Sequence, residues 1–402
     1  MVKRVLLIAS SCYPVNGAEE IVNIKMLQAF KHSKSFVVDL ISRKRKWEHY
    51  PTAPLEDYDV EVNSLQVVEV DNKKSMRTLW QHLKSLWYFG VIFKGSHWAA
   101  EVLRQSVDLY KSNKYDYVLT KSESSFLIGY YLKKHYGAKW VATWNDPYPV
   151  FKNPQPYGKG WQNKGDFFDK KIVRMMEKYV DVHIFPNNRL RDYMLQYLHI
   201  DISTTLVVPH VMIGSPSSFN KCADNTKLRL IHSGKLAYPR NPETFFKGLS
   251  KFIMAKGSEA VSVTILGSID AHVENLINMY NLKDIVEIKP PVPYTESLKI
   301  LKNYHIALII EANIDEGIFL PTKVSDFMQS GMRIFTISPR RGVLNDLYNK
   351  GYIPYFGPVN DSDEICAELL KIYDDFMNGF EGIIKICPEF REENVVKQYL
   401  GI

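Results

Sequence analysis

Long hydrophobic runs, clustered cysteines and glycine-rich phosphate loops are all missing from this sequence of 402 residues. No apolar run approaches the roughly 20 residues that span a bilayer, and the apolar run at residues 5–9 is too short for a signal peptide. The sequence contains no Gly-x-Gly-x-x-Gly, and no Asp-x-Asp stands where it could hold a metal. We therefore expect neither a metal ion nor a resident cofactor.

Cysteine is also scarce, and the cysteines that occur show no spacing typical of metal ligands: Cys12, Cys222, Cys366 and Cys387. Scattered cysteines of this kind favour reduced thiols, so we expect a cytoplasmic protein. The formal net charge of +7 fits an anionic substrate or membrane surface. Without nucleic-acid-binding motifs, this charge predicts no nucleic-acid partner.

What the sequence does have is apolar residues, at 46% of the chain, and a length that predicts two domains. One hydrophobic core rarely grows past roughly 250–300 residues. In the first half, apolar runs typical of strands alternate with helical patterns, the runs being 4–9, 37–41, 115–120, 139–143 and 182–187. A polar stretch at 214–226 reads as a linker, and a second alternation follows it, with runs at 228–232, 261–267, 285–288, 306–310 and 333–337. Alternation with short loops predicts an α/β chain with parallel, doubly wound sheets.

The stretch 311–334 carries the strongest functional signal. The strand predicted at 306–310 leads through a loop into a short helix, which we place at 322–329, after Pro321 and before Gly331. The N–H groups at the start of such a helix, with the charge of Lys323, suit a phosphate. One turn later, the carboxylate of Asp326 can accept hydrogen bonds from ribose hydroxyls. The pattern indicates a nucleotide-sugar site, and the alternative is an ordinary capped helix after a buried strand.

A glycine turn follows the strand at 228–232. Gly234 and Lys235 come directly after it, and Arg240 precedes a helix that we expect from residue 243. On the residues alone, either base could be a surface charge.

Two candidates lie in the first half. Gly17 stands in the loop between the first strand and the first helix, where a plain turn is the alternative. Asp146 follows the strand at 139–143, and functional groups gather beyond the carboxyl ends of parallel strands. The alternative for Asp146 is a carboxylate that caps the next helix.

Residues 73–98 combine tryptophans with basic residues. Six apolar residues fall at helical spacing, and four basic residues share the stretch: Met76, Leu79, Trp80, Leu83, Leu86 and Trp87, with Lys74, Arg77, Lys84 and Lys94. Such a segment suits the surface of an anionic membrane. It equally suits a helix that packs on its own domain.

The stretch around Lys323 resembles the nucleotide-binding segment of retaining glycosyltransferases of family 4, which have the GT-B fold. Their pattern Pro-x-Lys-x-x-Glu-x-x-x-x-Gly is matched here by Pro321, Lys323, Asp326 and Gly331. Two positions depart from it, because aspartate replaces the second glutamate and the first glutamate would fall on Ile318. Glu316 could supply that first carboxylate if the loop differs by two residues.

The resemblance implies two Rossmann-like, doubly wound domains with a cleft between them. Residues 1–211 would bind the acceptor, 212–384 the nucleotide sugar, and 385–402 would return to the first domain. It implies a retaining, metal-independent glycosyltransferase with a UDP or GDP sugar as donor and a saccharide or lipid-linked acceptor, in polysaccharide biosynthesis on the inner face of a membrane. The implied catalytic residues are Asp146, Arg240 and Lys323, and the implied binding residues are Gly17, Gly234, Lys235, Glu316, Pro321, Thr322 and Asp326.

Two other functions fit the same frame. A sugar-nucleotide epimerase of the GT-B type would act on the donor alone. A degenerate domain that serves as a binding or adaptor protein is favoured by the two departures at Ile318 and Asp326, and it would bind nucleotide weakly.

Overall fold

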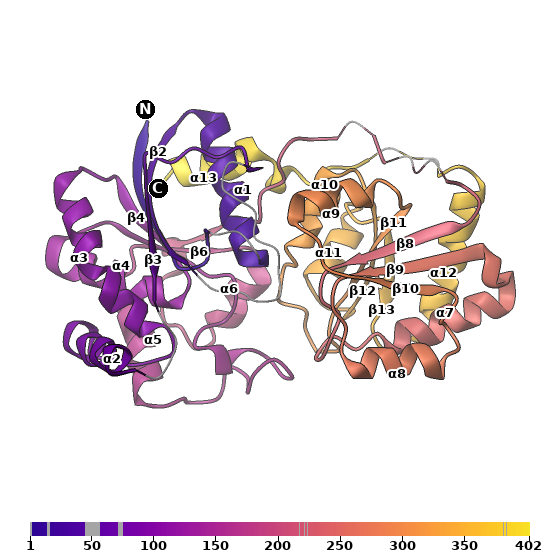
Figure 1. The fold of residues 1–402 in the computed structure, drawn as a ribbon, viewed down its shortest axis with the longest axis horizontal. Coiled ribbons are helices and arrows are strands. Elements are labelled where there is room, and N and C mark those ends of the chain that lie inside the picture. The colour runs from indigo at the N-terminus through magenta and orange to yellow at the C-terminus, as the bar shows by residue number, and fades with distance from the viewer. Residues whose placement is uncertain are drawn as a thin grey trace. The chain divides into compact units, whose positions relative to one another are not determined.

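The computed structural model describes residues 2–13, 17–44, 57–70, 75–216, 218–220, 222, 224–380, 382 and 384–402. The chain forms two compact units (Figure 1). Unit 1 comprises Met1–Ile213 and Glu389–Ile402, and unit 2 comprises Gly214–Pro388. The last residues of the chain therefore belong to the same unit as the first.

Unit 1 is built on a parallel sheet whose seven described strands run in the order β3-β2-β1-β4-β5-β6-β7. The strands are β1 (Lys3–Ala9), β2 (Phe36–Lys44), β3 (Ser64–Glu69), β4 (Tyr117–Lys121), β5 (Trp140–Thr143), β6 (Val182–Phe185) and β7 (Thr205–Val207). Residues from Val5 to Ala9 in the central strand β1 are fully buried. This explains the continuous apolar run, because helices cover both faces of such a sheet.

Helices flank this sheet on both sides. They are α1 (Ala18–Ser33), α2 (Met76–Phe89), α3 (Ser96–Ser112), α4 (Glu123–Tyr136), α5 (Phe167–Tyr179), α6 (Asn188–Met194) and α13 (Glu392–Leu400). Figure 1 shows α1 and α13 together on one side of the sheet, and α3 and α4 on the other. Short 3₁₀ helices add Val150–Lys152 and Ile202–Thr204.

Unit 2 contains a second parallel sheet, with six described strands in the order β10-β9-β8-β11-β12-β13. The strands are β8 (Leu228–Ser233), β9 (Val261–Leu266), β10 (Val286–Lys289), β11 (Ile306–Ile310), β12 (Arg333–Ser338) and β13 (Tyr355–Pro358). The helices are α7 (Glu243–Lys256), α8 (Ala271–Met279), α9 (Tyr294–Leu301), α10 (Lys323–Gln329), α11 (Val343–Asn349) and α12 (Ser362–Met377), with a 3₁₀ helix at Ser258–Ala260; another 3₁₀ helix, Pro388–Phe390, lies where the chain passes from unit 2 back to unit 1. Helix α7 packs on α12, and the side chains of Phe245, Leu249 and Phe252 enter the core of this unit.

Two parallel, doubly wound α/β sheets confirm the fold class that the alternating pattern predicts. All ten predicted strands are present, β11 with the predicted bounds and the other nine with at least one end shifted, and the helix placed at 322–329 begins at Lys323. The helices and strands that the pattern did not indicate include β3, α3, α12 and β13.

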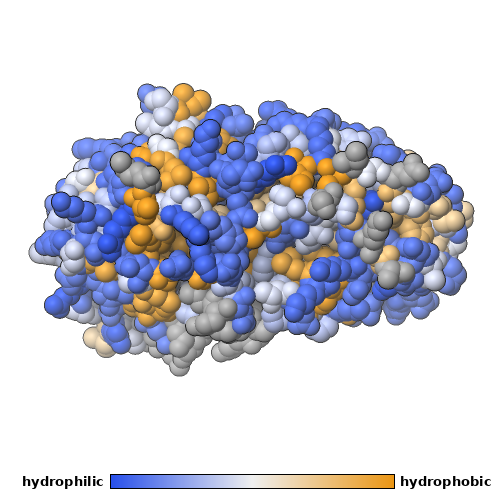
Figure 2. All heavy atoms as spheres, turned by 90° about the horizontal axis from the view of Figure 1, so that it is seen from above, coloured by the Kyte–Doolittle hydropathy of each residue, from blue (hydrophilic) through white to orange (hydrophobic). Residues whose placement is uncertain are grey.

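Most apolar side chains lie in the two cores, and the surface is mixed. Figure 2 shows one face, on which hydrophilic residues cover most of the area and hydrophobic residues form smaller patches between them. Among the described residues, no helix has both the length and the apolar character needed to cross a membrane.

Candidate functional site

Each sheet has one place where neighbouring strands lead to helices on opposite sides. In unit 2 this switch point lies between β8 and β11, because the chain proceeds from β8 to β9 on one side and from β11 to β12 on the other. Ligands of open parallel sheets bind beyond the carboxyl ends of the strands at such a point. We therefore expect the ligand site of unit 2 at the carboxyl ends of β8 and β11.

The end of β8 supplies a buried histidine. His232 is buried, and its Nε2 lies 3.3 Å from the Nζ of Lys323, the first residue of α10. Burial, and then the charges of Lys323 and Arg240, hold the pKa of His232 well below its usual range. A neutral imidazole can accept a hydrogen bond from an ammonium group, so His232 fixes the position of the lysine.

The end of β11 supplies a buried carboxylate. Glu311 follows the strand directly, its amide donates to the carbonyl of Ile337 at 2.9 Å, and its side chain is buried. The Nε of Arg240 lies 3.7 Å from Glu311 Oε1. Burial raises the pKa of Glu311, against the pull of Arg240 and Lys323. Two basic side chains from distant segments therefore meet around one carboxylate.

Lys323 is also strongly affected by its surroundings. Burial, together with the like charge of Arg240, lowers its pKa to about 7, although Glu311 and Asp326 act in the opposite direction. A lysine that exchanges its proton near neutral pH in a polar cluster is typical of a functional site, although structural ion networks also perturb pKa values. An anion entering here would stabilise the charged form of Lys323 and remain close to Arg240.

Gly234 is the residue of the turn after β8 that lies against the side chain of Lys323. It has a φ of +114°, and a Cβ at this position would lie 3.0 Å from both Cε and Nζ of Lys323. Its amide donates to the carbonyl of Leu266 at 2.7 Å, and a Cβ on Gly267 would lie 2.5 Å from the Gly234 oxygen. Only glycine adopts this backbone at low cost, and its lack of a side chain lets the end of Lys323 lie close against the turn.

Helix α10 carries the other predicted residues of the stretch. At its start the amide of Val324 donates to the carbonyl of Pro321 at 3.0 Å, and Thr322 occupies the N-cap position with no capping bond from its side chain. Asp326 is buried and accepts the hydroxyl of Tyr294 on α9 at 2.8 Å, while Gln329 Nε2 donates to that same tyrosine oxygen at 3.2 Å. The carboxylate is thus held from one side by a phenol.

The structure does not bring every predicted residue of unit 2 into this cluster. Lys235 is exposed, and Glu316 forms an ion pair of 3.1 Å with Arg341 in the loop between β12 and α11. Ile318, at the position of the first acid in the resembled motif, is buried. The carboxylate that faces Arg240 and Lys323 is Glu311.

Unit 1 has a comparable switch point between β1 and β4. Lys121 ends β4 and is buried, and burial lowers its pKa to about 8 against the pull of Glu19. The next residue, Ser122, has a φ of +81°, an unfavourable backbone for a side chain of this kind, and strained backbone is often found at functional sites. The hydroxyl of Ser122 lies 2.6 Å from that of Ser10, the residue that follows β1.

The two predicted residues of unit 1 lie in the segments that follow β1 and β5. Gly17 is the N-cap of α1, and a Cβ there would lie 2.6 Å from Oε2 of Glu20 in the same helix. Asp146 is exposed in the turn after β5. The neighbouring Asn16 lies outside the described residues.

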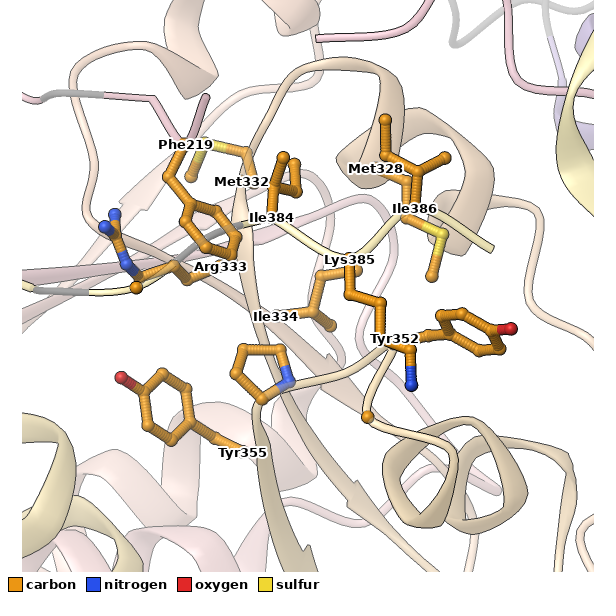
Figure 3. A pocket seen from close by; sticks show the side chains of 13 residues that line it. Phe219, Met328, Met332, Arg333, Ile334, Tyr352, Tyr355, Ile384, Lys385 and Ile386 are labelled. Atoms are coloured by element: carbon orange, nitrogen blue, oxygen red, sulfur yellow. The ribbon is translucent and has the colours of Figure 1, made fainter. Parts of the chain in front are cut away.

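A cavity of about 170 Å³ lies elsewhere in unit 2 (Figure 3). It is lined mainly by apolar side chains, including Met328, Met332 and Ile334, together with Arg333. Arg333 is the first residue of β12, so the cavity is at the amino end of the strand, and the His232–Lys323 cluster is at the carboxyl ends. The cavity is thus separate from the polar cluster.

Comparison with known proteins rests on the fold alone. The sequence matches no family model and no curated protein. Its structure superposes on HepE of Anabaena, crystallised with UDP, with a TM-score of 0.63 and 10% identity over 99% of this chain and 98% of HepE. Sucrose-phosphate synthase of Thermosynechococcus elongatus gives 0.62 and 12% over 98% and 94%.

The chain has the GT-B fold. A protein of Listeria monocytogenes described as a UDP-N-acetylglucosamine 2-epimerase superposes with a TM-score of 0.56 and 11% identity over 100% of this chain and 95% of that one. The GT-B fold therefore serves both transferases and an epimerase. Function has to be argued from the residues of the site.

Sequence reasoning did not assign roles to His232, Glu311, Tyr294 or Lys121. The available signal was positional, since three of these four residues stand at or beside the end of a predicted strand. Tyr294 gave no such signal, because its hydroxyl reaches Asp326 only through the packing of α9 beside α10. Within the described ranges, no three His, Cys, Asp or Glu side chains lie together in a way that could hold a metal ion.

Proposed function

We propose that this protein is a glycosyltransferase that moves a sugar from a nucleotide-diphosphate donor to a saccharide or lipid-linked saccharide acceptor. The observation that carries the proposal is the meeting of Lys323, Arg240 and the bare turn at Gly234 at the β8/β11 switch point. Solved GT-B structures that resemble this one include a complex of HepE with UDP and glucose. A site with two basic side chains beside a turn that has no side chain of its own suits a diphosphate.

The chemistry follows from where charge develops. When the bond between the anomeric carbon and the diphosphate oxygen breaks, negative charge builds on the phosphate. Lys323 and Arg240 stabilise that charge without a metal ion, and groups fixed in advance lose little energy in reorganising. The acceptor oxygen forms the new bond to the anomeric carbon from the same face, its proton passes to the departing phosphate, and the anomeric configuration is retained.

The remaining donor contacts come from α10 and the two turns. In this proposal Asp326, which accepts the hydroxyl of Tyr294 at 2.8 Å, also accepts the ribose hydroxyls of UDP or GDP. Thr322 and Pro321 open the helix beside the phosphate, and Lys235 and Glu316 remain predicted contacts.

The acceptor half of the reaction belongs to unit 1 in this proposal. Lys121 and the adjoining serine hydroxyls lie at its switch point, Gly17 stands at the start of α1, and Asp146 follows β5. Polysaccharide assembly is the proposed setting. A cytoplasmic location and a contact with an anionic membrane through residues 73–98 complete the proposal.

An epimerase is the second candidate, favoured by the Listeria monocytogenes protein of the same fold. It would convert the donor with no acceptor present and would need an acid and a base on either side of the sugar. An adaptor without catalysis is the third candidate, favoured by Ile318 and by Asp326 in place of glutamate. It would bind no nucleotide sugar tightly.

Thermal unfolding with UDP, GDP and their common sugar conjugates tests the proposal. A ligand at a hundred times its dissociation constant adds about 2.7 kcal/mol to the free energy of unfolding. We expect one nucleotide class to stabilise the wild type and to lose that effect in Lys323→Ala and in Asp326→Ala. Lys247→Ala, on the exposed side of α7, is the control that keeps it.

Product analysis then separates the candidates. Sugar appearing on an added acceptor supports transfer, and conversion of the donor alone supports the epimerase. No stabilisation by any nucleotide would leave the adaptor as the better account.

A further inference from the structure

Helix α2 exposes the residues that a buried amphipathic helix would hide. Its outer side is a continuous stripe of large apolar side chains, the least exposed at 41% (Leu86) and the most at 87% (Trp87). The stripe, called the α2 ridge here, consists of Met76, Leu79, Trp80, Leu83, Leu86 and Trp87. The alternative in which these residues pack on their own domain does not hold for this helix.

The inner side of α2 is partly polar and is fixed by specific bonds. Gln81 and Ser85 are buried, together with Phe89. Gln81 donates to the carboxylate of Glu101 on α3, and the hydroxyl of Ser85 donates to the carbonyl of Val91 at 2.8 Å. Turning the helix to bury the ridge would break both interactions and expose Phe89. The outward direction of the ridge is therefore built into unit 1.

Both ends of α2 are also well defined. The Ser75 hydroxyl accepts the amide of Thr78 at 3.2 Å, and Gly90 ends the helix with a φ of +70°. A helix of 14 residues is about 20 Å long. An apolar stripe of that length is uncommon on a protein with nothing bound to it and marks a surface for a partner.

The charge around the ridge indicates what that partner is. Helix α2 contains no aspartate or glutamate. Arg77 and Lys84 are two turns apart on one flank of the ridge, and Lys94 follows in the loop before α3. Arg77 bonds Glu101 at 3.1 Å, whereas the described residues give Lys84 and Lys94 no ion pair. Net positive charge beside an apolar face complements an anionic, apolar surface.

We propose that the α2 ridge docks unit 1 on an anionic lipid bilayer, with α2 lying in the plane of the interface. Trp80 and Trp87 enter the headgroup region, where indole rings are favoured. Lys84 and Lys94 contact the anionic headgroups. A second copy of this chain fits less well, because a two-fold contact through the ridge would bring the same positive charges together. Lys74 lies outside the described residues.

This inference deepens the membrane contact in the proposed function and rests on α2 alone. Binding to lipid requires no nucleotide, and the nucleotide test requires no lipid. Failure of one therefore leaves the other standing.

Co-sedimentation of the full chain with vesicles tests the inference. One set of vesicles is phosphatidylcholine alone, and the other is equal parts phosphatidylcholine and phosphatidylglycerol. We expect binding to the mixed vesicles, and we expect Trp80→Ser with Trp87→Ser to weaken the partition coefficient by about tenfold or more. Lys84→Gln and Lys94→Gln should each weaken it by about fivefold at low salt, since each lysine near such a surface contributes about 1 kcal/mol.

Matched controls come from unit 2. Met254 and Met377 are exposed by 78% and 65% at the ends of α7 and α12, and their joint replacement by serine should leave binding unchanged. Lys247→Gln with Lys283→Gln removes two exposed charges that are distant in sequence from α2 and should also have little effect.

The vesicle experiment can support or overturn docking of the α2 ridge on a bilayer. Selective loss in the ridge and lysine variants, with the controls unaffected, supports docking through α2. No binding to either vesicle overturns it. A dimer in analytical ultracentrifugation that dissociates in Trp80→Ser with Trp87→Ser, without lipid binding, also overturns it and assigns the ridge to a second copy.

Discussion

The protonation of Lys323 gives the cluster at β8 and β11 a measurable signature. Its pKa of about 7 in the free protein means that the ammonium form is lost as pH rises through neutrality. A nucleoside diphosphate binds the ammonium form better, so its affinity should fall as pH rises above about 7, by up to about tenfold per pH unit. Calorimetric titration at several pH values measures this fall.

The control for this experiment is Lys323→Arg. The terminal phosphate of the nucleotide also titrates in this pH range, and arginine stays charged throughout. The arginine variant therefore gives the baseline due to the ligand. A wild-type profile that matches this baseline would show that Lys323 does not set the affinity.

Glu311 should set the midpoint of that profile. Its carboxylate raises the pKa of Lys323, against the larger effect of burial. Glu311→Gln removes that charge at almost the same volume, so the midpoint should move to lower pH. Glu316→Gln, whose side chain pairs with Arg341 at 3.1 Å, should leave the midpoint where it is. A midpoint that moves in Glu316→Gln and stays in place in Glu311→Gln would show that Glu316, and not Glu311, acts on Lys323.

Sequence patterns identify some residues of the β8/β11 cluster and miss others, for a physical reason. Lys323, Gly234 and Arg240 follow strands or open helices, and the pattern singles them out. Glu311 and His232 are charged or titratable side chains at strand ends, and nothing local shows that they face the same volume. Only the order of the strands brings β8 beside β11 and so makes them neighbours.

At the scale of elements, the turn between β8 and α7 depends on a residue without a side chain. Gly234→Ala should cost about 1–2 kcal/mol of stability because of its positive φ. It should also weaken nucleotide binding by about tenfold, since the new Cβ displaces the Lys323 side chain and a charged hydrogen bond is lost. Thermal unfolding and calorimetric titration measure the two effects.

Gly257→Ala is the matched control. Gly257 has a φ of +90°, follows α7, and has open space where a Cβ would stand. It should lose similar stability and keep full nucleotide affinity. Equal nucleotide affinities in Gly234→Ala and Gly257→Ala would show that the Gly234 turn is not part of the nucleotide site.

One buried carboxylate of β2 binds residues of the neighbouring segments of unit 1. Asp39 in β2 accepts hydrogen bonds from Arg4, Asn63, Ser64 and Tyr115, at distances between 2.6 and 3.3 Å. Asp39→Ala leaves these donors without their acceptor, and we expect a loss of about 3 kcal/mol in the free energy of unfolding. Urea denaturation measures the loss.

Asp108→Ala is the comparison for Asp39. Its carboxylate lies 3.8 Å from Arg104 Nε, and both side chains are largely exposed. An exposed pair of this kind contributes at most about 0.5 kcal/mol. A similar loss in both variants would mean that the Asp39 hydrogen bonds are worth no more than a surface pair.

Periodicity predicts elements better than it predicts which side of an element is buried. The helical spacing of Leu79, Trp80, Leu83 and Trp87 indicates one face of a helix, and the structure has that helix at α2. Spacing alone does not say that Gln81 and Ser85 find partners inside the unit and leave the apolar face outside. Burial is a tertiary property, so the outward ridge appears only in the folded unit.

At the scale of the whole molecule, the chain forms two separate units, and its last residues, 389–402, belong to the first of them. Helix α13 returns to unit 1, where Tyr399 is buried. Its ring packs edge-on to Phe30 at 5.1 Å, and its carbonyl accepts the hydroxyl of Tyr117 at 3.3 Å. The stability of unit 1 therefore depends on residues at both ends of the chain.

Calorimetry can follow the two cores separately if a nucleotide binds unit 2. Tyr399→Ala should lower the free energy of unfolding of unit 1 by about 3–5 kcal/mol, which is about 10 °C for a unit of this size. The transition that shifts with nucleotide should stay in place, because its ligand contacts lie in unit 2. Phe252→Ala, in the core of unit 2, should do the reverse. A loss of the nucleotide shift in Tyr399→Ala would mean that donor binding requires unit 1 as well.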